Sequence, residues 1–368
     1  MGTKKSFLRK YQNKNPTLWR NSYKKSALLK CVLLTAVGIF TEATAVHAED
    51  NGRLSVVEEN DYFSSGGRDQ HYTQGIQLDY LSPDLGPDGI ALPMKWIASF
   101  SPIFSDGKTT TSRKLDFSLA QKLYTPRDTT LNTPDPRDRP YAGWINAGVS
   151  LLKDADQKVL DHLQIQIGLV GPGALGRETQ NHYHIGINSP ISHGWSSQLD
   201  NEPTFNLYYD RHYRFSHDLT HALSVEVLPS AGVAVGNVYD YAAMGGRVRV
   251  GRNLKVDYGP NRIAPGPTGT AYFNKDNFAP DTLFGWYVSV GVEGRAMAHN
   301  MFLNGNSFSS GPSVPMRPLV GDLEGSIAIF YSDWAKLSYS HILRSQEFYT
   351  HEDPDNFGSF QLSVGLNF

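Results

Sequence analysis

The sequence predicts an all-β protein: a twelve-stranded antiparallel transmembrane β-barrel with short helical segments in its loops. Three observations predict this fold. Apolar and polar residues alternate in many short segments, the chain after residue 48 has no apolar run of about eighteen residues, and the chain ends on an aromatic residue. In the last segment, 360–368, every even position is apolar and every odd position is polar or glycine. This alternation suits a strand with lipid on one face and a polar lumen on the other, and the terminal Phe368 resembles an outer-membrane assembly signal.

Residues 1–48 are predicted to be a secretory signal peptide. Lysines and arginines are frequent in the first thirty positions, an apolar run follows from 31 to 40, and small residues end the segment. A helix that crosses a bilayer needs about 20 apolar residues, so this short run favours a cleaved signal over a retained anchor. The remainder, 49–368, is expected to form a single outer-membrane β-barrel domain.

The charge balance after the signal argues against a basic binding face. The signal holds 9 of the 34 Lys and Arg residues and one of the 36 Asp and Glu residues, which leaves 25 basic and 35 acidic side chains. We therefore expect no nucleic-acid partner. The single cysteine, Cys31, leaves with the signal, so the barrel is expected to be stable without a disulfide.

Twelve segments carry the strand pattern, an even number, as is usual for bacterial single-chain barrels. They are 53–60, 72–82, 113–123, 141–152, 161–170, 203–214, 222–235, 244–253, 283–298, 319–330, 335–344 and 358–368. If both termini face the periplasm, the outer loops are about 61–71, 124–140, 171–202, 236–243, 299–318 and 345–357. The inner turns then include 153–157, 216–220 and 331–334, with two longer inner connections at 83–112 and 254–282. In the first of these, apolar residues 90–100 are expected to form a helix that plugs or caps the barrel.

Unusual polar motifs gather at the outer ends of the predicted strands. They are Glu59-Asn60-Asp61, Gln70-His71-Tyr72-Thr73-Gln74-Gly75, Tyr124-Thr125-Pro126-Arg127-Asp128, Asp138-Arg139-Pro140-Tyr141-Ala142-Gly143-Trp144, and the cluster Glu178, Gln180, Asn181, His182 and His184. A barrel brings such strand ends to one rim, where polar groups from several strands converge on a rigid scaffold. Because the last cluster is costly to desolvate, it is either a wet surface loop or a reaction centre.

In these motifs the chain resembles the LpxR-type lipid A 3′-O-deacylase family of outer-membrane enzymes. The resemblance also rests on Gly168-x-x-Gly171-Pro172, Gly194-Trp195, Gly294-Arg295-Ala296 and Phe302-Leu303-x-Gly305-Asn306, and it covers residues 53–368. It implies a Gram-negative outer-membrane barrel that removes the ester-linked 3′ acyloxyacyl chain of lipid A, in lipopolysaccharide of the outer leaflet. It also implies calcium (Ca²⁺) as a cofactor. We expect a membrane-embedded monomer.

The resemblance also implies roles for single residues. His184 matches the catalytic histidine and Gln180 its neighbour in that motif, while Asn60, Asp61 and Thr73 match polar residues of the first two strands.

One position departs from the family pattern. An acidic residue lies six positions beyond the histidine in a family member, and that position is Pro190 here. If the carboxylate helps to hold the metal, Glu178 or Glu202 could replace it, and the sequence does not separate the two.

A water mechanism is consistent with these residue types. A neutral histidine near pH 7 can take a proton from water, which makes His184 the expected general base. Calcium prefers carboxylate and amide oxygens, which Asp61, Asn60 and Glu178 could supply, and a bound cation would polarise the ester carbonyl. No G-x-S-x-G motif marks a serine nucleophile.

Two arginines are candidates for binding the substrate. Arg127 and Arg139 could each contact a lipid phosphate. For Arg139, the alternative role is to fix the start of the fourth strand.

Simpler structural roles remain open for the other candidates as well. The Asn60-Asp61 pair could simply open a turn, and Thr73 could be an ordinary strand residue. Gln180 could serve only to orient His184.

Two other functions compete with the deacylase. An outer-membrane phospholipase would use a Ser/His/Asn site, with Ser64, Ser65, Ser189 or Ser192 as the serine. A porin-like barrel would be no enzyme and would not need His184. Lipid A mass spectrometry separates these possibilities, whereas acyl-chain length and latency in the native membrane cannot be inferred from the sequence.

Overall fold

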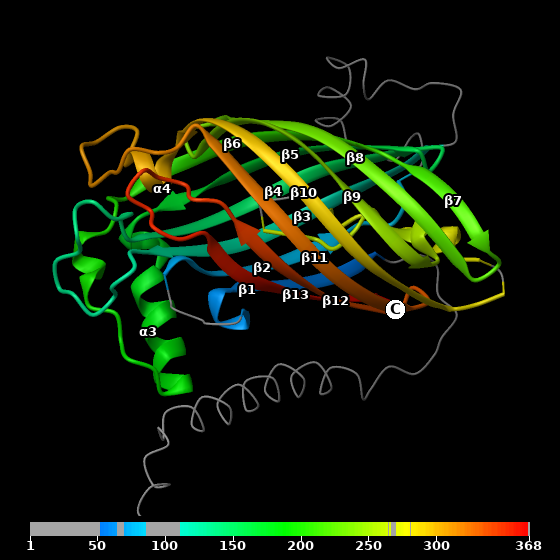
Figure 1. Ribbon diagram of the computed structural model, residues 1–368, viewed down its shortest axis with the longest axis horizontal. Coiled ribbons are helices and arrows are strands. Elements are labelled where there is room, and N and C mark those ends of the chain that lie inside the picture. Colours follow the sequence, from blue (N-terminus) through cyan, green and yellow to red (C-terminus); the bar gives the residue numbers. More distant parts are fainter. Residues whose placement is uncertain are drawn as a thin grey trace, which may run out of the picture.

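The chain closes into an antiparallel β-barrel, seen from the side in Figure 1. This computed structural model describes residues 52–64, 70–85, 111–263, 265, 270–279 and 281–366. Strand β1 (Arg53–Asn60) pairs with both β2 (His71–Leu81) and β13 (Asp355–Gly365), so the first and last described strands of the chain lie side by side.

Two of the thirteen strands are halves of one barrel strand. Both β6 (Glu202–Tyr213) and β7 (Phe215–Thr220) pair with β8 (Leu223–Gly236), on successive parts of its length. The barrel is therefore twelve-stranded, and the predicted fold class is confirmed.

The remaining elements follow the predicted order closely. The other strands are β3 (Thr111–Thr125), β4 (Ala142–Ala155), β5 (Val159–Val170), β9 (Tyr239–Arg252), β10 (Phe284–Asn300), β11 (Leu319–Tyr331) and β12 (Ala335–Arg344). Two α-helices, α3 (Gly176–Ile187) and α4 (Met301–Asn304), lie in loops at one end of the barrel (Figure 1). The 3-10 turns are η1 (Asp61–Phe63), η2 (Pro172–Ala174), η3 (Gly194–Ser197), η4 (Leu254–Val256) and η5 (Lys275–Asn277). We call the end that carries α3 the α3 end.

Most strands have one apolar outer face and one polar inner face. On β10, Val288, Val290 and Val292 are each more than half exposed, while the alternate residues Ser289 and Glu293 are buried. Exposed valines are stable in lipid, and the polar side chains satisfy one another inside the barrel. No helix in the described part of the chain is long and apolar enough to span a membrane.

The inside of the barrel is filled near the α3 end by aromatic side chains. Tyr124 stacks on Phe302 with ring centroids 4.1 Å apart, and Trp144 and Tyr239 pack against the same ring. The Tyr124 and Tyr239 hydroxyls share a hydrogen bond of 2.8 Å, so the polar ends of these buried rings are satisfied.

The segment between β9 and β10 fills the barrel from the opposite end. The Asn261 side chain donates to Asp79 at 3.0 Å, and Arg262 forms ion pairs with Glu59 at 2.5 Å and with Glu324 at 3.0 Å. These contacts reach three different strands, so the segment is fixed inside the barrel. The helix expected at 90–100 lies outside the described residues, and the plugging segment that the structure shows is the other long inner connection.

Two predicted turns are wrong. Residues 216–220 belong to strand β7, which continues β6 after a bend at Arg214. The predicted loop 236–243 is a tight turn, because the Asn206 side chain accepts hydrogen bonds from the backbone N–H groups of Val238 and Tyr239 and lets β9 begin at Tyr239.

The buried arginine of the plug gives a stability prediction. In an Arg262→Ala variant, Glu59 would lose its buried arginine and Glu324 would keep only Arg247, so we expect a loss of about 3 kcal/mol. Urea unfolding of the folded barrel in detergent micelles measures this. The matched control is Arg252→Ala, which removes an exposed pair with Asp281 and should change the midpoint little. Equal effects of the two substitutions would contradict the assigned role of the plug.

Candidate functional site

Helix α3 begins against the outer surface of the barrel. Gly143 on β4 shares its face with the outward residues Ala147 and Val149. A Cβ atom placed on Gly176 would lie 3.1 Å from the Gly143 Cα and 2.7 Å from the Trp195 ring. The Gln121 side chain of β3 adds a hydrogen bond of 2.6 Å to the Ala174 carbonyl. The helix is thus seated on the outer wall of β3 and β4, and Figure 1 shows it at the left end of the barrel.

The buried face of α3 carries the predicted residues. Gly176, Gln180 and His184 are four residues apart, so they lie on one side of the helix, and all three are buried. The Gln180 Oε1 accepts a hydrogen bond of 2.7 Å from the Trp195 indole N–H. Because Trp195 packs with Leu123 and Tyr141, Gln180 is held in place by the wall itself.

His184 is oriented by the chain that follows the helix. The helix ends at Ile187, and its capping residue Asn188 has a φ of 56°, in the left-handed region, after which the chain turns back. This return places the Pro190 carbonyl 2.5 Å from the His184 Nδ1. A carbonyl can only accept, so the proton is assigned to Nδ1 and the lone pair of the neutral ring lies on Nε2. The position where the family pattern has an acid therefore contributes a backbone acceptor to His184.

Asn60 and Asp61 form a fixed pair at the end of β1. The Asn60 Oδ1 accepts from the Tyr62 backbone N–H at 2.8 Å, and the Asp61 Oδ2 accepts from the Gln70 backbone N–H at 2.8 Å. Both side chains are buried. The two residues offer an amide oxygen and a carboxylate, which are the donor types that calcium takes in proteins.

The outward direction of Asn60 follows from the strand alternation. Leu54 and Val56 of β1 are exposed on the lipid-facing side, and Asn60 has the same parity. Asn60 and the buried face of α3 therefore both belong to the outer wall at the α3 end, not to the lumen.

Thr73 sits at an irregularity in β2. The pairing with β3 shifts between Tyr72 and Gln74, which leaves Thr73 as the extra residue of a β-bulge. Its hydroxyl lies 2.7 Å from the Thr125 hydroxyl. A bulge re-aims a side chain, and here it brings Thr73 and Thr125 together at the α3 end.

Three other predicted residues lie apart from this surface. Glu178 is exposed on α3, about 200° around the helix from Gln180. Arg127 is exposed and ion-paired with Glu352. Arg139 is fully buried, 3.1 Å from Glu347 and with its guanidinium 4.9 Å from the centre of the Tyr124 ring, so it anchors its loop to the barrel. The metal role of Glu178 and the substrate roles of the two arginines stay predictions.

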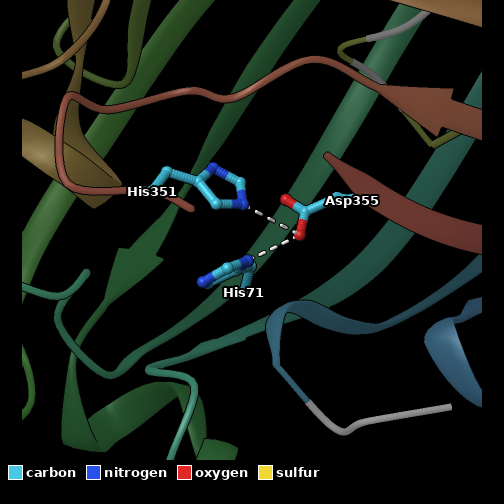
Figure 2. Close-up of side chains that lie close together, drawn as sticks. All are labelled: His71, His351 and Asp355. Carbon is cyan, nitrogen blue, oxygen red and sulfur yellow. Dashed lines mark hydrogen bonds and ion pairs between the residues drawn. The ribbon is translucent and has the colours of Figure 1, made fainter. Parts of the chain in front are cut away.

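One cluster of two histidines and an aspartate at the α3 end was not predicted from the sequence. Figure 2 shows His71, His351 and Asp355 pointing toward one another. The His71 Nδ1 lies 2.5 Å from the Asp355 Oδ1, and the His351 Nε2 lies 3.4 Å from the same oxygen. His71 belongs to a motif that the sequence had singled out, but its partners lie more than 270 positions away and carry no recognisable signal.

Asp138 connects the loop after β3 to this cluster. Burial raises the pKa of its carboxyl, but the nearby His71 imidazole and hydrogen bonds from the backbone N–H groups of Arg127 and Arg139 outweigh this and hold the pKa below its usual value. The carboxylate therefore stays charged at neutral pH beside His71.

Comparisons with known proteins agree with this architecture. A family model described as "Outer membrane protein LpxR" matches residues 28–366. No curated protein sequence matches the chain. Among solved structures, LpxR from Salmonella typhimurium aligns with a TM-score of 0.67 and 20% identity, over 85% of this chain and 100% of that one. The β domain of the Bordetella autotransporter BrkA aligns with a TM-score of 0.40 and 9% identity, over 86% of this chain and 100% of that one. Since the family model spans nearly the whole sequence, the chain belongs to the LpxR family of outer membrane proteins.

Proposed function

We propose that this protein is an outer-membrane esterase that hydrolyses the ester-linked 3′ acyloxyacyl chain of lipid A. The observation that carries the proposal is the position of His184, which is buried on α3, fixed in one tautomer, and part of a helix seated on the lipid-facing wall. A lipid in the surrounding leaflet reaches this wall by lateral diffusion, whereas a soluble substrate would be expected to enter through the barrel. We place the α3 end at the outer leaflet, where lipopolysaccharide lies.

His184 acts as the general base in this mechanism. Its Nε2 takes a proton from water as the water oxygen bonds to the ester carbonyl carbon. The Pro190 carbonyl, already bonded to Nδ1–H, stabilises the imidazolium that forms. The tetrahedral intermediate then expels the sugar 3-oxygen, which takes the proton back from Nε2, and the acyloxyacyl chain leaves as a carboxylic acid.

The other residues fix the geometry of the site. Gln180 holds its position through Trp195 and keeps the buried face of α3 against the wall. Asn60 and Asp61 would hold calcium, which when bound supplies positive charge for the developing oxyanion. Two protein oxygens are fewer than the six to eight ligands that calcium takes, so water and substrate oxygens would complete the shell.

The phospholipase alternative would use one of four serines. Ser65 lies outside the described residues. The Ser64 hydroxyl donates to the Asp61 carbonyl at 2.7 Å, and Ser192 is buried where its backbone N–H bonds to Asn181. The porin alternative conflicts with the filled barrel. The experiment below also separates these functions.

Replacement of the base is the most informative test of the activity. His184→Ala should lower deacylation by about 10²–10⁴-fold, because that is the usual contribution of general base catalysis. Mass spectrometry of lipid A from cells that express each variant measures the loss of one acyloxyacyl unit. His182→Ala, an exposed histidine on the same helix, is the control and should retain activity. A fully active His184→Ala protein would refute the proposal, and accumulation of lysophospholipid would support the phospholipase.

The packing of α3 against the barrel can be tested by glycine substitutions, which leave the polar residues of the site unchanged. Gly176→Leu would push the helix away from Gly143 and Trp195, and we expect about a 100-fold loss of activity in a barrel that still folds. Gly186→Leu is the control, because nothing lies within 4 Å of a Cβ atom there. Folding is checked by heat-modifiability on gels. Equal activity of the two variants would show that the position of the helix does not matter.

Removal of calcium tests whether the activity depends on a bound calcium ion. A calcium chelator should abolish deacylation, and added Ca²⁺ should restore it. Asp61→Asn should raise the Ca²⁺ concentration needed for half-maximal activity, because it removes the carboxylate charge from the proposed shell. Asp276→Asn, exposed at the opposite end, should leave it unchanged. Activity that persists in excess chelator would remove calcium from the proposal.

A further inference from the structure

Three buried ligand-type groups converge at the α3 end, separately from the residues of the proposed esterase. The His71 Nδ1, the His351 Nε2 and an Asp355 carboxylate oxygen all lie within 4.8 Å of one another (Figure 2). Among the described residues, this is the one group of three or more His, Cys, Asp or Glu side chains placed to share an ion. His71 begins β2, Asp355 begins β13, and His351 lies in the loop before it.

The polar atoms of this cluster are only partly satisfied. The buried Asp355 Oδ2 has no hydrogen-bond partner among the described residues, and the buried His351 Nε2 makes only the 3.4 Å contact with the Asp355 Oδ1. Both residues are about 4% exposed. Buried polar atoms usually have a good partner, so one unpartnered atom and one long contact in a single cluster point to a bound species.

His71 also adopts an unusual backbone conformation. Its φ is 60°, in the left-handed region that non-glycine residues seldom adopt. Such strain persists where the surroundings enforce it and often occurs at functional sites. Here it directs the ring toward Asp355.

We propose that His71, His351 and Asp355 form a binding site for a divalent transition-metal ion of the Zn²⁺ type. Two imidazole nitrogens and one carboxylate are a common ligand set for zinc, whereas calcium prefers oxygen ligands. In a tetrahedral zinc site, neighbouring ligand atoms lie about 3.3 Å apart. The 3.4 Å between His351 and Asp355 already fits, and the 2.5 Å between His71 and Asp355 would have to widen by less than an ångström.

A carboxylate next to the second ring nitrogen of His71 supports the assignment of this residue as a ligand. The Asp138 Oδ1 lies 3.7 Å from the His71 Nε2, on the side of the ring away from Asp355. Metal-binding histidines usually direct their second nitrogen to a carboxylate or carbonyl, which fixes the ring and increases its basicity. Asp138 is itself held by the backbone N–H groups of Arg127 and Arg139.

Two contacts oppose the ion and have to change. The hydrogen bond of 2.5 Å between the His71 Nδ1 and the Asp355 Oδ1 must open and release its proton, because both atoms would become ligands. The His351 Nδ1 accepts from the Glu347 backbone N–H at 3.2 Å. Ligation through Nε2 would place the ring proton on Nδ1, so this hydrogen bond must open. It is a single long neutral bond, and metal coordination by three residues outweighs it.

A cavity beside the cluster gives an ion access to it. The cavity has a volume of about 430 Å³ and is lined in part by His71 and His351. Its acidic lining residues outnumber its arginines and would raise the local concentration of cations. The acidic residues are Asp128, Asp135, Asp138, Glu352 and Asp353, and the arginines, Arg127 and Arg137, pair with Glu352 and Asp135.

The site is tested by metal binding alone, so its failure is distinct from failure of the esterase. Full-length protein in detergent is stripped of metal and titrated with Zn²⁺ in the presence of excess Ca²⁺. We expect one Zn²⁺ per chain and a rise in the unfolding temperature. Asp355→Asn and His351→Gln should each weaken binding by more than about 100-fold. The control His182→Gln, an exposed histidine of α3, should bind as the wild type does. Equal binding by all variants would overturn the proposal.

A spectroscopic measurement on the wild type covers the case in which the variants do not fold. Co²⁺ in a tetrahedral site absorbs strongly in visible light, whereas hexa-aqua Co²⁺ absorbs weakly. We expect the strong bands on addition of one equivalent of Co²⁺, and their loss on addition of Zn²⁺. Absence of these bands, or their persistence in excess Zn²⁺, would overturn the proposal.

Discussion

The close approach of α3 to the barrel wall is the constraint on which the proposed site depends. Two glycines, Gly143 and Gly176, face each other where any side chain would separate the helix from the strand. Trp195 closes the gap and bonds to Gln180, one turn along the same helical face. His184 follows one turn later, and the Pro190 carbonyl fixes its ring. The orientation of the proposed base therefore depends on packing between two residues without side chains.

The barrel supplies the rigid support for this arrangement. Its lumen is filled by stacked aromatics at the α3 end and by buried ion pairs with the β9–β10 segment at the other. A filled barrel deforms little, so strand ends that are distant in sequence keep fixed relative positions. The outer face of the same strands stays apolar and faces lipid. A site on that face can receive a substrate that never leaves the membrane.

Much of this fold could be predicted from the sequence, and the reasons are physical. A strand between lipid and a polar lumen must alternate apolar and polar residues. Segments such as 283–298 and 319–330 could therefore be predicted as strands from their local sequence pattern. The position of α3 on the barrel could not be predicted, because it depends on close contact between Gly143 and Gly176, which are thirty-three positions apart in the sequence. The position of the β9–β10 segment inside the barrel could not be predicted either, since it is fixed by contacts with three distant strands, through Asp79, Glu59 and Glu324. His71 stood in a visible motif, but its meeting with His351 and Asp355 depends on how β2 and β13 flank β1.

The proposed function requires lipid A to bind on the outer wall of the barrel beside His184. The most direct measurement is a structure of the His184→Gln variant in a lipid bilayer that contains lipid A. We expect density for the lipid A sugar and its 3′ acyl ester on the outer wall beside His184 and Asn60, beyond the contact between Gly176 and Gly143. Lipid A bound inside the barrel, or on the wall away from α3, would contradict it.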